Sequence, residues 1–280
     1  MEYRRDIDGL RAVAVLAVVL AHADFAWFSG GFVGVDIFFV ISGYLITGII
    51  AREIGENRFS LAGFYERRVR RILPALFVMM AVCLIGGWFL LPPPQYETLG
   101  WSAIAATFFV SNIYFQRITG DYFASDAELE PLLHTWSLGV EEQFYIVIPL
   151  LLMLLLSRIP KLLKPVMIAG VAGSFALSAY ATHFHPVANF YALPTRAWEL
   201  GIGALLALGV VPSIRKAWGA QILALAGIGA IVFAVLVYDK TTAFPGVAAL
   251  LPVLGSAILI WVHREHQTWV GRVLSMPPMV

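Results

Sequence analysis

An arginine, a histidine and two aspartates stand among apolar residues in RAVAVLAVVLAHADFAWFSGGFVGVD, the stretch from Arg11 to Asp36. Ionisable side chains in a segment that is apolar enough to enter a bilayer are candidates for function, because burying them there is costly. In one regular helix the separation of Arg11 from His22 corresponds to about 1100° of rotation and a rise of about 16 Å. Both side chains are therefore predicted to lie on one helix face, half a membrane apart.

A secretory signal peptide is the alternative interpretation of this start. A basic N-terminus precedes an apolar run, and Ala21 to Ala23 imitates a cleavage site. However, Asp6, Asp8 and Arg11 interrupt the region, and comparable apolar segments follow along the chain. The sequence therefore favours a membrane helix.

The next apolar segment, FVGVDIFFVISGYLITGII, carries Asp36. Asp36, Val40, Gly43 and Thr47 recur at helical spacing, which gives one small and polar face suited to close helix packing. A buried carboxylate costs several kcal/mol unless it is paired, so Asp36 needs a partner. The alternative to a functional Asp36 is a structural hydrogen-bonding role, with Gly43 at a point of close helix approach. Ser42 lacks a GxSxG motif and is not predicted to be a nucleophile.

A group of arginines in FYERRVRRILPAL follows within about one and a half helical turns. The planar guanidinium can grip a phosphate through two hydrogen bonds. Anchoring of the chain by lipid headgroups is the alternative, but the absence of lysine favours recognition of a specific anion. The members of this arginine cluster are Arg67, Arg68, Arg70 and Arg71.

Further ionisable residues stand at the starts of two later apolar segments. The first of these segments is preceded by His134 and contains Glu141 and Glu142 near its start. The second begins next to Arg196 and contains Glu199. Arg196 and Glu199 are three residues apart and can meet on one helix face. A structural ion pair and a site formed by convergence of several spans both remain open. The sequence contains no Walker loop, no GxGxxG helix start and no metal-ligand cluster, so no metal site is predicted.

Composition sets the class of protein that must position these groups. Of the 280 residues, 60% are hydrophobic and 13% are charged, whereas soluble domains carry about 25% charged residues. The chain is therefore predicted to be an integral membrane protein with membrane lipids as partners. A net charge of +1 gives no basic field for binding nucleic acid.

A span needs roughly 20 apolar residues, which predicts an all-α polytopic transmembrane helical bundle. It should have about eight crossing helices plus one re-entrant or ninth apolar segment, 99–115. The Lys and Arg clusters all lie on the cytoplasmic side only if 116–138 lies outside, which favours a re-entrant hairpin for 99–115. The crossings are predicted near 10–28, 32–50, 72–91, 139–157, 165–182, 197–211, 219–238 and 246–262.

The chain resembles the acyltransferase-3 family, the integral-membrane O-acyltransferases that acetylate bacterial cell-surface polysaccharides. The family's Arg-x10-His pattern falls on Arg11 and His22, its FFxxSG pattern on Phe38 to Gly43, and its RxxR pattern on Arg67 to Arg71. The stretches that carry the resemblance, in the family's order, are RRDIDGLRAVAVLAVVLAH, GGFVGVDIFFVISGYLI, FYERRVRRILPAL, PLLHTWSLGVEEQFYIVIPLL and PTRAWELGIGALLA.

This resemblance implies transfer of an acyl group, most often acetyl, from acetyl-CoA or another acyl-CoA to a hydroxyl of a surface glycan. No permanently bound cofactor is expected, and the location implied is the bacterial inner (cytoplasmic) membrane. Peptidoglycan, exopolysaccharide, the O-antigen of lipopolysaccharide biosynthesis and small exported metabolites all fit as acceptors. Family members usually continue into a further helix, and many carry an extracytoplasmic SGNH domain. Residues 1–280 are therefore expected to be a single, C-terminally incomplete transmembrane acyltransferase domain without an SGNH domain.

The implied mechanism assigns a role to each group near the outer surface. His22 is the expected general base on the acceptor hydroxyl, because its pKa is ordinarily near neutral. Arg11 is expected to orient the donor or to stabilise oxyanion charge. Asp36, Glu141 or Glu142 is expected to orient the histidine.

The arginine cluster is expected to hold the donor's phosphates on the cytoplasmic side. The acceptor is expected to meet His134, Trp136, Arg196 and Glu199 on the outer side. The sequence leaves open whether the thioester reaches into the membrane or a covalent acyl intermediate crosses it. A transporter or flippase of a lipid-linked glycan is the alternative function. A purely structural scaffold is a third hypothesis, and the buried charged groups argue against it.

Overall fold

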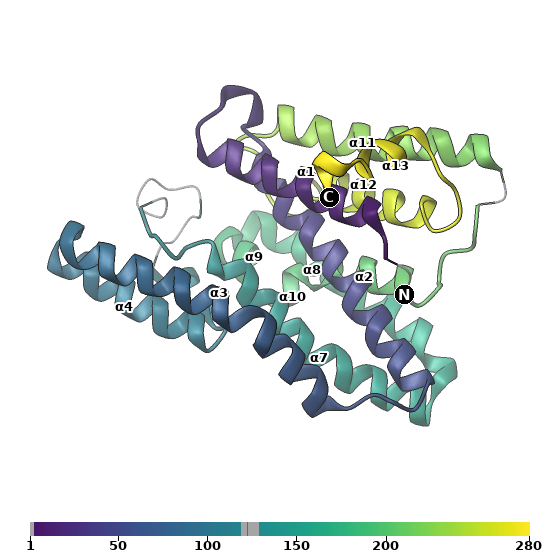
Figure 1. Cartoon of the computed structure of the whole chain (residues 1–280), viewed down its shortest axis with the longest axis horizontal. Coiled ribbons are helices and arrows are strands. Elements are labelled where there is room, and N and C mark those ends of the chain that lie inside the picture. Colours follow the sequence, from purple (N-terminus) through teal and green to yellow (C-terminus); the bar gives the residue numbers. More distant parts are fainter. Residues whose placement is uncertain (1–2, 119–121, 123–128, 215) are drawn as a thin grey trace.

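The computed structural model describes residues 3–118, 122, 129–214 and 216–280, and every regular element within these ranges is a helix. Long helices pack side by side into one bundle (Figure 1). The α-helices are α1 (Arg5–His22), α2 (Gly34–Gly55), α3 (Leu61–Leu90), α4 (Pro93–Thr107), α5 (Ser111–Ile118), α7 (Thr135–Arg158), α8 (Leu163–Phe184), α9 (Pro186–Tyr191), α10 (Leu193–Ala207), α11 (Ala217–Val237), α12 (Leu250–Val262) and α13 (Trp269–Leu274). Short 3₁₀ turns occur at η1 (Ala26–Phe28), η2 (Gly31–Val33), η3 (Pro160–Leu162) and η4 (Pro277–Met279).

Helix α2 is the centre of the bundle. Of the most apolar stretch of Gly31–Gly55, 72% is buried, and α2 contacts α1, α7, α10 and α12. Figure 1 shows α2 crossing the middle of the view, with α11 to α13 on one side and α3 and α7 on the other. Asp36 and most of the other side chains of α2 are therefore inside the protein.

Two glycines allow α2 and α10 to touch backbone to backbone. A Cβ atom on Gly43 would lie 1.9 Å from the carbonyl oxygen of Leu200, and one on Gly203 would lie 2.0 Å from that of Val40. Neither position has room for a side chain. The prediction that Gly43 marks a close helix approach is confirmed, and this crossing fixes Asp36 relative to α10.

Helix α1 is part of the bundle along its whole length. Ile7, Leu10, Ala14 and Ala17 are buried, and α1 contacts both α2 and α13. This packing supports the membrane-helix interpretation over the signal-peptide alternative.

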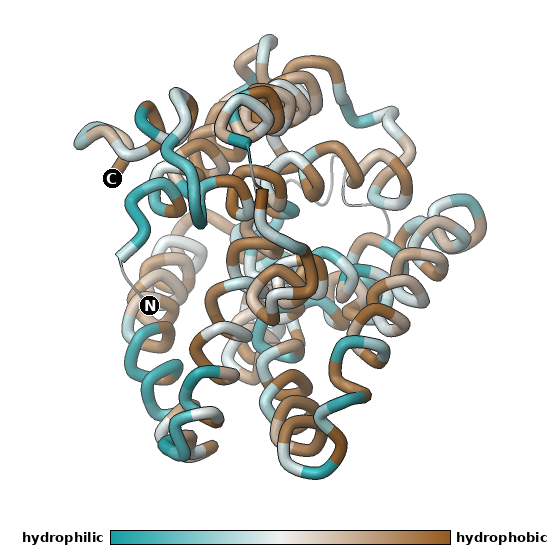
Figure 2. The backbone as a smooth tube through the Cα atoms, turned by 90° about the vertical axis from the view of Figure 1, so that its right-hand side faces the viewer, coloured by the Kyte–Doolittle hydropathy of each residue, from teal (hydrophilic) through white to brown (hydrophobic). Residues whose placement is uncertain are grey.

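Five helical segments are long and apolar enough to cross a membrane, among the residues that the structure describes. Figure 2 shows long hydrophobic stretches along the tubes, with hydrophilic residues gathered at several helix ends and loops. The part of the chain that the structure describes is all-helical, and its long apolar helices fit a multi-pass membrane protein. The predicted total of about eight crossings stays a prediction. The five segments are Gly31–Gly55, Leu61–Leu90, Thr135–Arg158, Pro160–Phe184 and Ala217–Val237.

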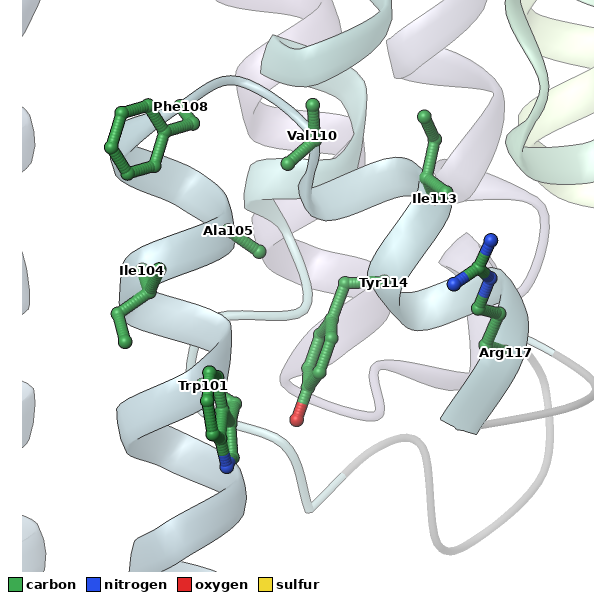
Figure 3. A pocket seen from close by; sticks show the side chains of 8 residues that line it. All are labelled: Trp101, Ile104, Ala105, Phe108, Val110, Ile113, Tyr114 and Arg117. Atoms are coloured by element: carbon green, nitrogen blue, oxygen red, sulfur yellow. The ribbon is translucent and has the colours of Figure 1, made fainter.

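The segment 99–115 folds as two helices rather than one. Helix α4 ends at Thr107 and α5 begins at Ser111, and between them Phe109 adopts a left-handed φ of 55°. Figure 3 shows the turn and the side chains between the two helices. The groove that they line has a volume of about 250 Å³. The side chains that line the groove are Trp101, Ile104, Ala105, Phe108, Val110, Ile113, Tyr114 and Arg117.

A side chain of α7 binds the backbone of this turn and also the α5 side chain of Asn112. Gln143 on α7 donates 3.0 Å to the carbonyl oxygen of Phe109 and 2.8 Å to the Oδ1 of Asn112. Gly139 leaves room for the turn, because a Cβ atom there would lie 3.2 Å from the same Phe109 oxygen. Irregular backbone at membrane depth is tolerated where protein groups satisfy it in this way. The shape matches the predicted hairpin, and its placement in the membrane stays a prediction.

Candidate functional site

A buried ion triad joins α2 to α10. The Arg196 guanidinium lies 3.2 Å from Asp36 and 3.1 Å from Glu199, and all three residues have 0% exposure. Asp36 therefore has the partner that its burial requires, and Arg196 and Glu199 meet as their spacing predicts. Aromatic rings surround the guanidinium carbon at 5.4 to 5.6 Å and close the triad from solvent. These rings belong to Phe39, Trp136, Phe190 and Phe244.

This enclosure bears on the predicted acceptor site. Trp136 is only 1% exposed, and Arg196 and Glu199 are fully buried, so none of the three offers a surface to a glycan in this structure. The rings of Phe190 and Phe244 also cover the triad, although neither residue was assigned a role from the sequence. No local pattern identifies them, because they reach Arg196 only through the tertiary fold. A part for Trp136, Arg196 and Glu199 in acceptor binding stays a prediction.

His22 and His134 lie close to each other near the ends of α1 and α7. Both side chains are exposed. Partial burial lowers the pKa of His134, a hydrogen bond with the backbone of Pro131 opposes this, and the charge of His22 lowers the pKa further. The two imidazoles are therefore within electrostatic reach of each other.

The His22 ring is oriented by its own helix. Its Nδ1 lies 2.8 Å from the carbonyl oxygen of Val18. A carbonyl only accepts, so Nδ1 carries the hydrogen and the lone pair of the neutral ring is on Nε2. The exposed Nε2 is thus suited to take a proton from a hydroxyl group.

The three carboxylates expected to orient His22 have other partners in this structure, and their role toward His22 stays a prediction. The backbone of Val18 holds the ring instead. Asp36 is paired with Arg196, Glu141 accepts from Ser42, and Glu142 accepts from Arg68. The physical reason is geometric, since these carboxylates lie along α2 and α7, whereas the nearest acceptor to the last turn of α1 is the α1 backbone.

Arg11 lies on the same helix as His22, as predicted. Its guanidinium donates 2.9 Å to Asp8, one turn earlier. The pair is partly exposed, with 32% of the Arg11 side chain and 25% of the Asp8 side chain accessible. Arg11 can therefore leave its ion pair with Asp8 and bind an anionic ligand with little loss of free energy.

The arginine cluster divides into two kinds of environment. Arg67 pairs with Glu53 at 2.9 Å and Arg70 with Glu66 at 2.7 Å, and both arginines are largely exposed. Arg71 is also exposed. These side chains lie at a surface and can meet a polyanion.

Arg68 instead points into the bundle. It donates 2.6 Å to Glu142, and the two side chains are 12% and 8% exposed. Its guanidinium carbon also lies 4.1 Å from the centre of the Tyr145 ring. Arg68 thus links α3 to α7, a role that the sequence did not separate from those of its neighbours.

Glu141 is part of a hydrogen-bonded group that the sequence reasoning missed. Ser42 on α2 donates 2.8 Å to one Glu141 oxygen, and Tyr145 donates 3.1 Å to the other. Glu141 also lines a cavity of about 150 Å³ between α2 and α7. The only available signal was that Glu141 and Tyr145 are four residues apart, because the pairing of α2 with α7 is not visible in the sequence.

Within the described ranges no group of three or more His, Cys, Asp or Glu residues could hold a metal ion. The site consists of a histidine pair at one end, exposed arginines at the other, and buried polar groups between them. These side chains are of the kinds that transfer protons and position anionic groups.

Comparison with known sequences gives the class of protein. The sequence model of a family described as an acyltransferase domain matches residues 4–276. The chain is therefore a membrane-embedded acyltransferase domain, and it belongs to the acyltransferase-3 family. The family resemblance drawn from the motifs is confirmed.

Several relatives are similar over most of this chain. "Peptidoglycan O-acetyltransferase OatA" of Listeria monocytogenes is 36% identical over 300 residues, which cover 99% of this chain and 47% of that protein. "Putative peptidoglycan O-acetyltransferase YrhL" of Bacillus subtilis is 38% identical over 74% of this chain and 33% of its own length. "Putative membrane-bound transacylase BcsY" of Komagataeibacter xylinus is 36% identical over 98% of this chain and 68% of that protein. The chain thus spans half or less of the first two relatives. No solved structure matches.

Proposed function

We propose that this domain transfers an acetyl group from an acyl-CoA donor to a hydroxyl of a cell-surface glycan at the bacterial inner membrane. The observation that carries the proposal is the arrangement of ionisable groups in the bundle. Exposed arginines on α3 face one side, and His22, with its Nε2 lone pair exposed, faces the other. Peptidoglycan is the acceptor of first choice, because two similar proteins carry it in their names.

The arginine cluster supports a donor with several phosphates. Arg67, Arg70 and Arg71 lie within about three turns of the start of α3 and are exposed. Arg67 pairs with Glu53, and Arg70 pairs with Glu66. Exposed ion pairs of this kind contribute little to stability in water, so a phosphate group can replace the glutamate as partner. Phosphate groups make stronger, two-point contacts with guanidinium than a point charge would.

His22 supports the acceptor side of the reaction. Its Nε2 takes the proton of the acceptor hydroxyl, and the oxygen attacks the acyl carbonyl. The donor's sulfur leaves as a thiolate and is protonated. Arg11, about 16 Å away along α1, lies between the two surfaces, where it orients the donor or balances negative charge that develops on the carbonyl oxygen.

The test uses the full-length natural protein that contains this chain, reconstituted in lipid nanodiscs with acetyl-CoA and soluble peptidoglycan fragments. Release of CoA and acetylation of the fragments are expected for the wild type. His22→Ala is expected to lower acetylation by at least about 100-fold, within the range for loss of a general base. His185→Ala is the matched control, since His185 is another exposed histidine, at the start of α9.

Two results would oppose the proposal. Near-normal acetylation by His22→Ala would remove His22 from the mechanism. Movement of a lipid-linked glycan across the membrane without any consumption of acetyl-CoA would instead favour the transporter.

A further inference from the structure

The carboxylate of Glu141 holds two hydroxyl groups inside the bundle. Ser42 Oγ donates 2.8 Å to Oε1, and Tyr145 Oη donates 3.1 Å to Oε2. A hydroxyl that donates to a carboxylate can lose its proton to that carboxylate as it attacks an electrophile. Neither hydroxyl has a part in the proposed function as stated so far.

The two hydroxyls differ in access. Tyr145 is 1% exposed and is covered by the Arg68 guanidinium. Ser42 is partly exposed, and it follows Phe38 by four residues and Val35 by seven on α2. Residues at these spacings share a helix face, and both Phe38 and Val35 line the cavity between α2 and α7. The cavity wall includes the hydrogen-bond acceptor of Ser42, Glu141, and its α2 neighbours, although not Ser42 itself. Of the two hydroxyls bound to Glu141, Ser42 is therefore the one that a substrate in this cavity could reach by passing beyond Phe38.

The cavity suits a small acyl group. Its volume is about 150 Å³, which exceeds the roughly 30 Å³ share of one water molecule in the liquid. Apolar side chains form most of its wall, and Glu141 is its acidic group. The lining residues are Val35, Phe38, Phe39, Ser137, Leu138 and Glu141.

Ser42 also lies between the two ends of the proposed site. It is eight residues from the first residue of α2, which is about 12 Å along the helix axis. On one side the Ser42–Glu141–Tyr145 group adjoins Arg68, which belongs to the arginine cluster. Ser137 lies on the cavity wall and is one turn from His134, whose carbonyl oxygen accepts 3.2 Å from it. Ser42 is thus placed to receive a group from the arginine side and to release it toward the histidine side.

We propose that Ser42 is a covalent acyl-acceptor site that carries the acetyl group between donor and glycan, an inference that rests on the proposed function. In the first step the Ser42 Oγ–carbon bond forms and the thioester carbon–sulfur bond breaks. The hydroxyl proton passes through Glu141 to the departing sulfur, which leaves as the CoA thiol. In the second step His22 takes the proton of the acceptor hydroxyl, the acceptor oxygen bonds to the acetyl carbon and the Oγ–carbon bond breaks. The proton is then returned to Oγ, so that the serine hydroxyl is restored.

The test measures acetyl groups bound to the protein. The full-length natural protein in nanodiscs is incubated with radiolabelled acetyl-CoA in the absence of acceptor, quenched in acid and digested for peptide mass spectrometry. The wild type is expected to carry an ester-linked acetyl group on Ser42 that is lost when peptidoglycan fragments are added before the quench. Ser42→Ala should lose at least about 100-fold of this label, and Ser42→Cys should carry a thioester that neutral hydroxylamine removes.

Ser157→Ala is the matched control, because Ser157 is on the same α7 helix as Glu141 but is exposed near its far end. It should label like the wild type. Monodispersity and melting temperature report whether Ser42→Ala is folded. If it is not, the position of the label in the wild type and in Ser42→Cys decides the question.

Different results of this experiment would overturn the role of Ser42 and the proposed function. Label on another residue, or acetylation of fragments by a wild type that carries no label, would overturn the role of Ser42 and leave the acyltransferase intact. The same holds if folded Ser42→Ala acetylates fragments at the wild-type rate. A wild type that neither consumes acetyl-CoA nor acetylates any tested glycan would overturn the proposed function itself.

Discussion

Arg68 on α3 donates a 2.6 Å hydrogen bond to Glu142 on α7, and both side chains are mostly buried. Arg71, three residues further along α3, is exposed instead. One short basic motif therefore contains a residue that joins two helices and a residue that is available to a ligand. Lysine substitution should affect the two positions differently.

Replacing Arg70 and Arg71 together by lysine should weaken coenzyme A binding and leave stability unchanged. The charge is kept, but the two-point grip on phosphate is lost. Each lost charge-assisted bond should cost about 1.5 to 3 kcal/mol of binding, roughly tenfold or more. Arg68→Lys should instead lower the melting temperature, because the buried Glu142 loses its matched partner.

Titration calorimetry and thermal unfolding in detergent measure the two effects. Arg158→Lys, at the end of α7, is the control, because Arg158 is predicted to be cytoplasmic and lies outside the cluster. Unchanged affinity in the Arg70→Lys, Arg71→Lys protein would show that these residues only anchor the chain to lipid headgroups.

The ion triad predicts an asymmetry between its members. Arg196→Gln leaves Asp36 and Glu199 buried together without a cation, which should cost about 3 to 5 kcal/mol of stability. Asp36→Asn leaves the pair of Arg196 with Glu199 in place and should cost less. Thermal unfolding of both variants in the same detergent is the measurement. Equal losses would mean that the triad does not behave as a cation shared by two carboxylates.

The α2–α10 crossing can be tested with a single methyl group. Gly43→Ala places a Cβ atom 1.9 Å from the Leu200 oxygen, so the two helices must separate. Overpacking of this kind typically costs about 1 to 3 kcal/mol. Gly229→Ala on α11 is the matched control, because nothing lies within 4 Å of a Cβ atom there. A melting temperature that falls equally in both variants would contradict this view of the crossing.

The sequence predicts the parts of this structure that depend on local spacing. Arg196 and Glu199 are one helical turn apart, and their contact follows from that separation alone. Arg11 and His22 share α1 for the same reason. Gly43 stands in a small, polar stripe, and such stripes favour close helix contact.

Contacts between distant segments could not be predicted in the same way. Ser42 and Glu141 are 99 residues apart, and only the packing of α2 on α7 joins them. The carboxylates expected at His22 are engaged by Ser42, Arg68 and Arg196 instead. Composition and spacing show that a buried charge needs a partner, but the choice among several partners depends on which helices become neighbours.

The last prediction concerns the side of the membrane on which residue 129 lies. If α4 and α5 form a hairpin that enters and leaves on one side, Leu129 lies outside, whereas Asn57, between α2 and α3, lies in the cytoplasm. In a Cys83→Ser background, Leu129→Cys should react with a membrane-impermeant maleimide in intact spheroplasts. Asn57→Cys should react only after the membrane is permeabilised, and it serves as the control. Protection of Leu129→Cys until permeabilisation would instead show that the segment from α4 to α5 crosses the bilayer once. The distribution of positive charge would then fail as a guide to topology after residue 91.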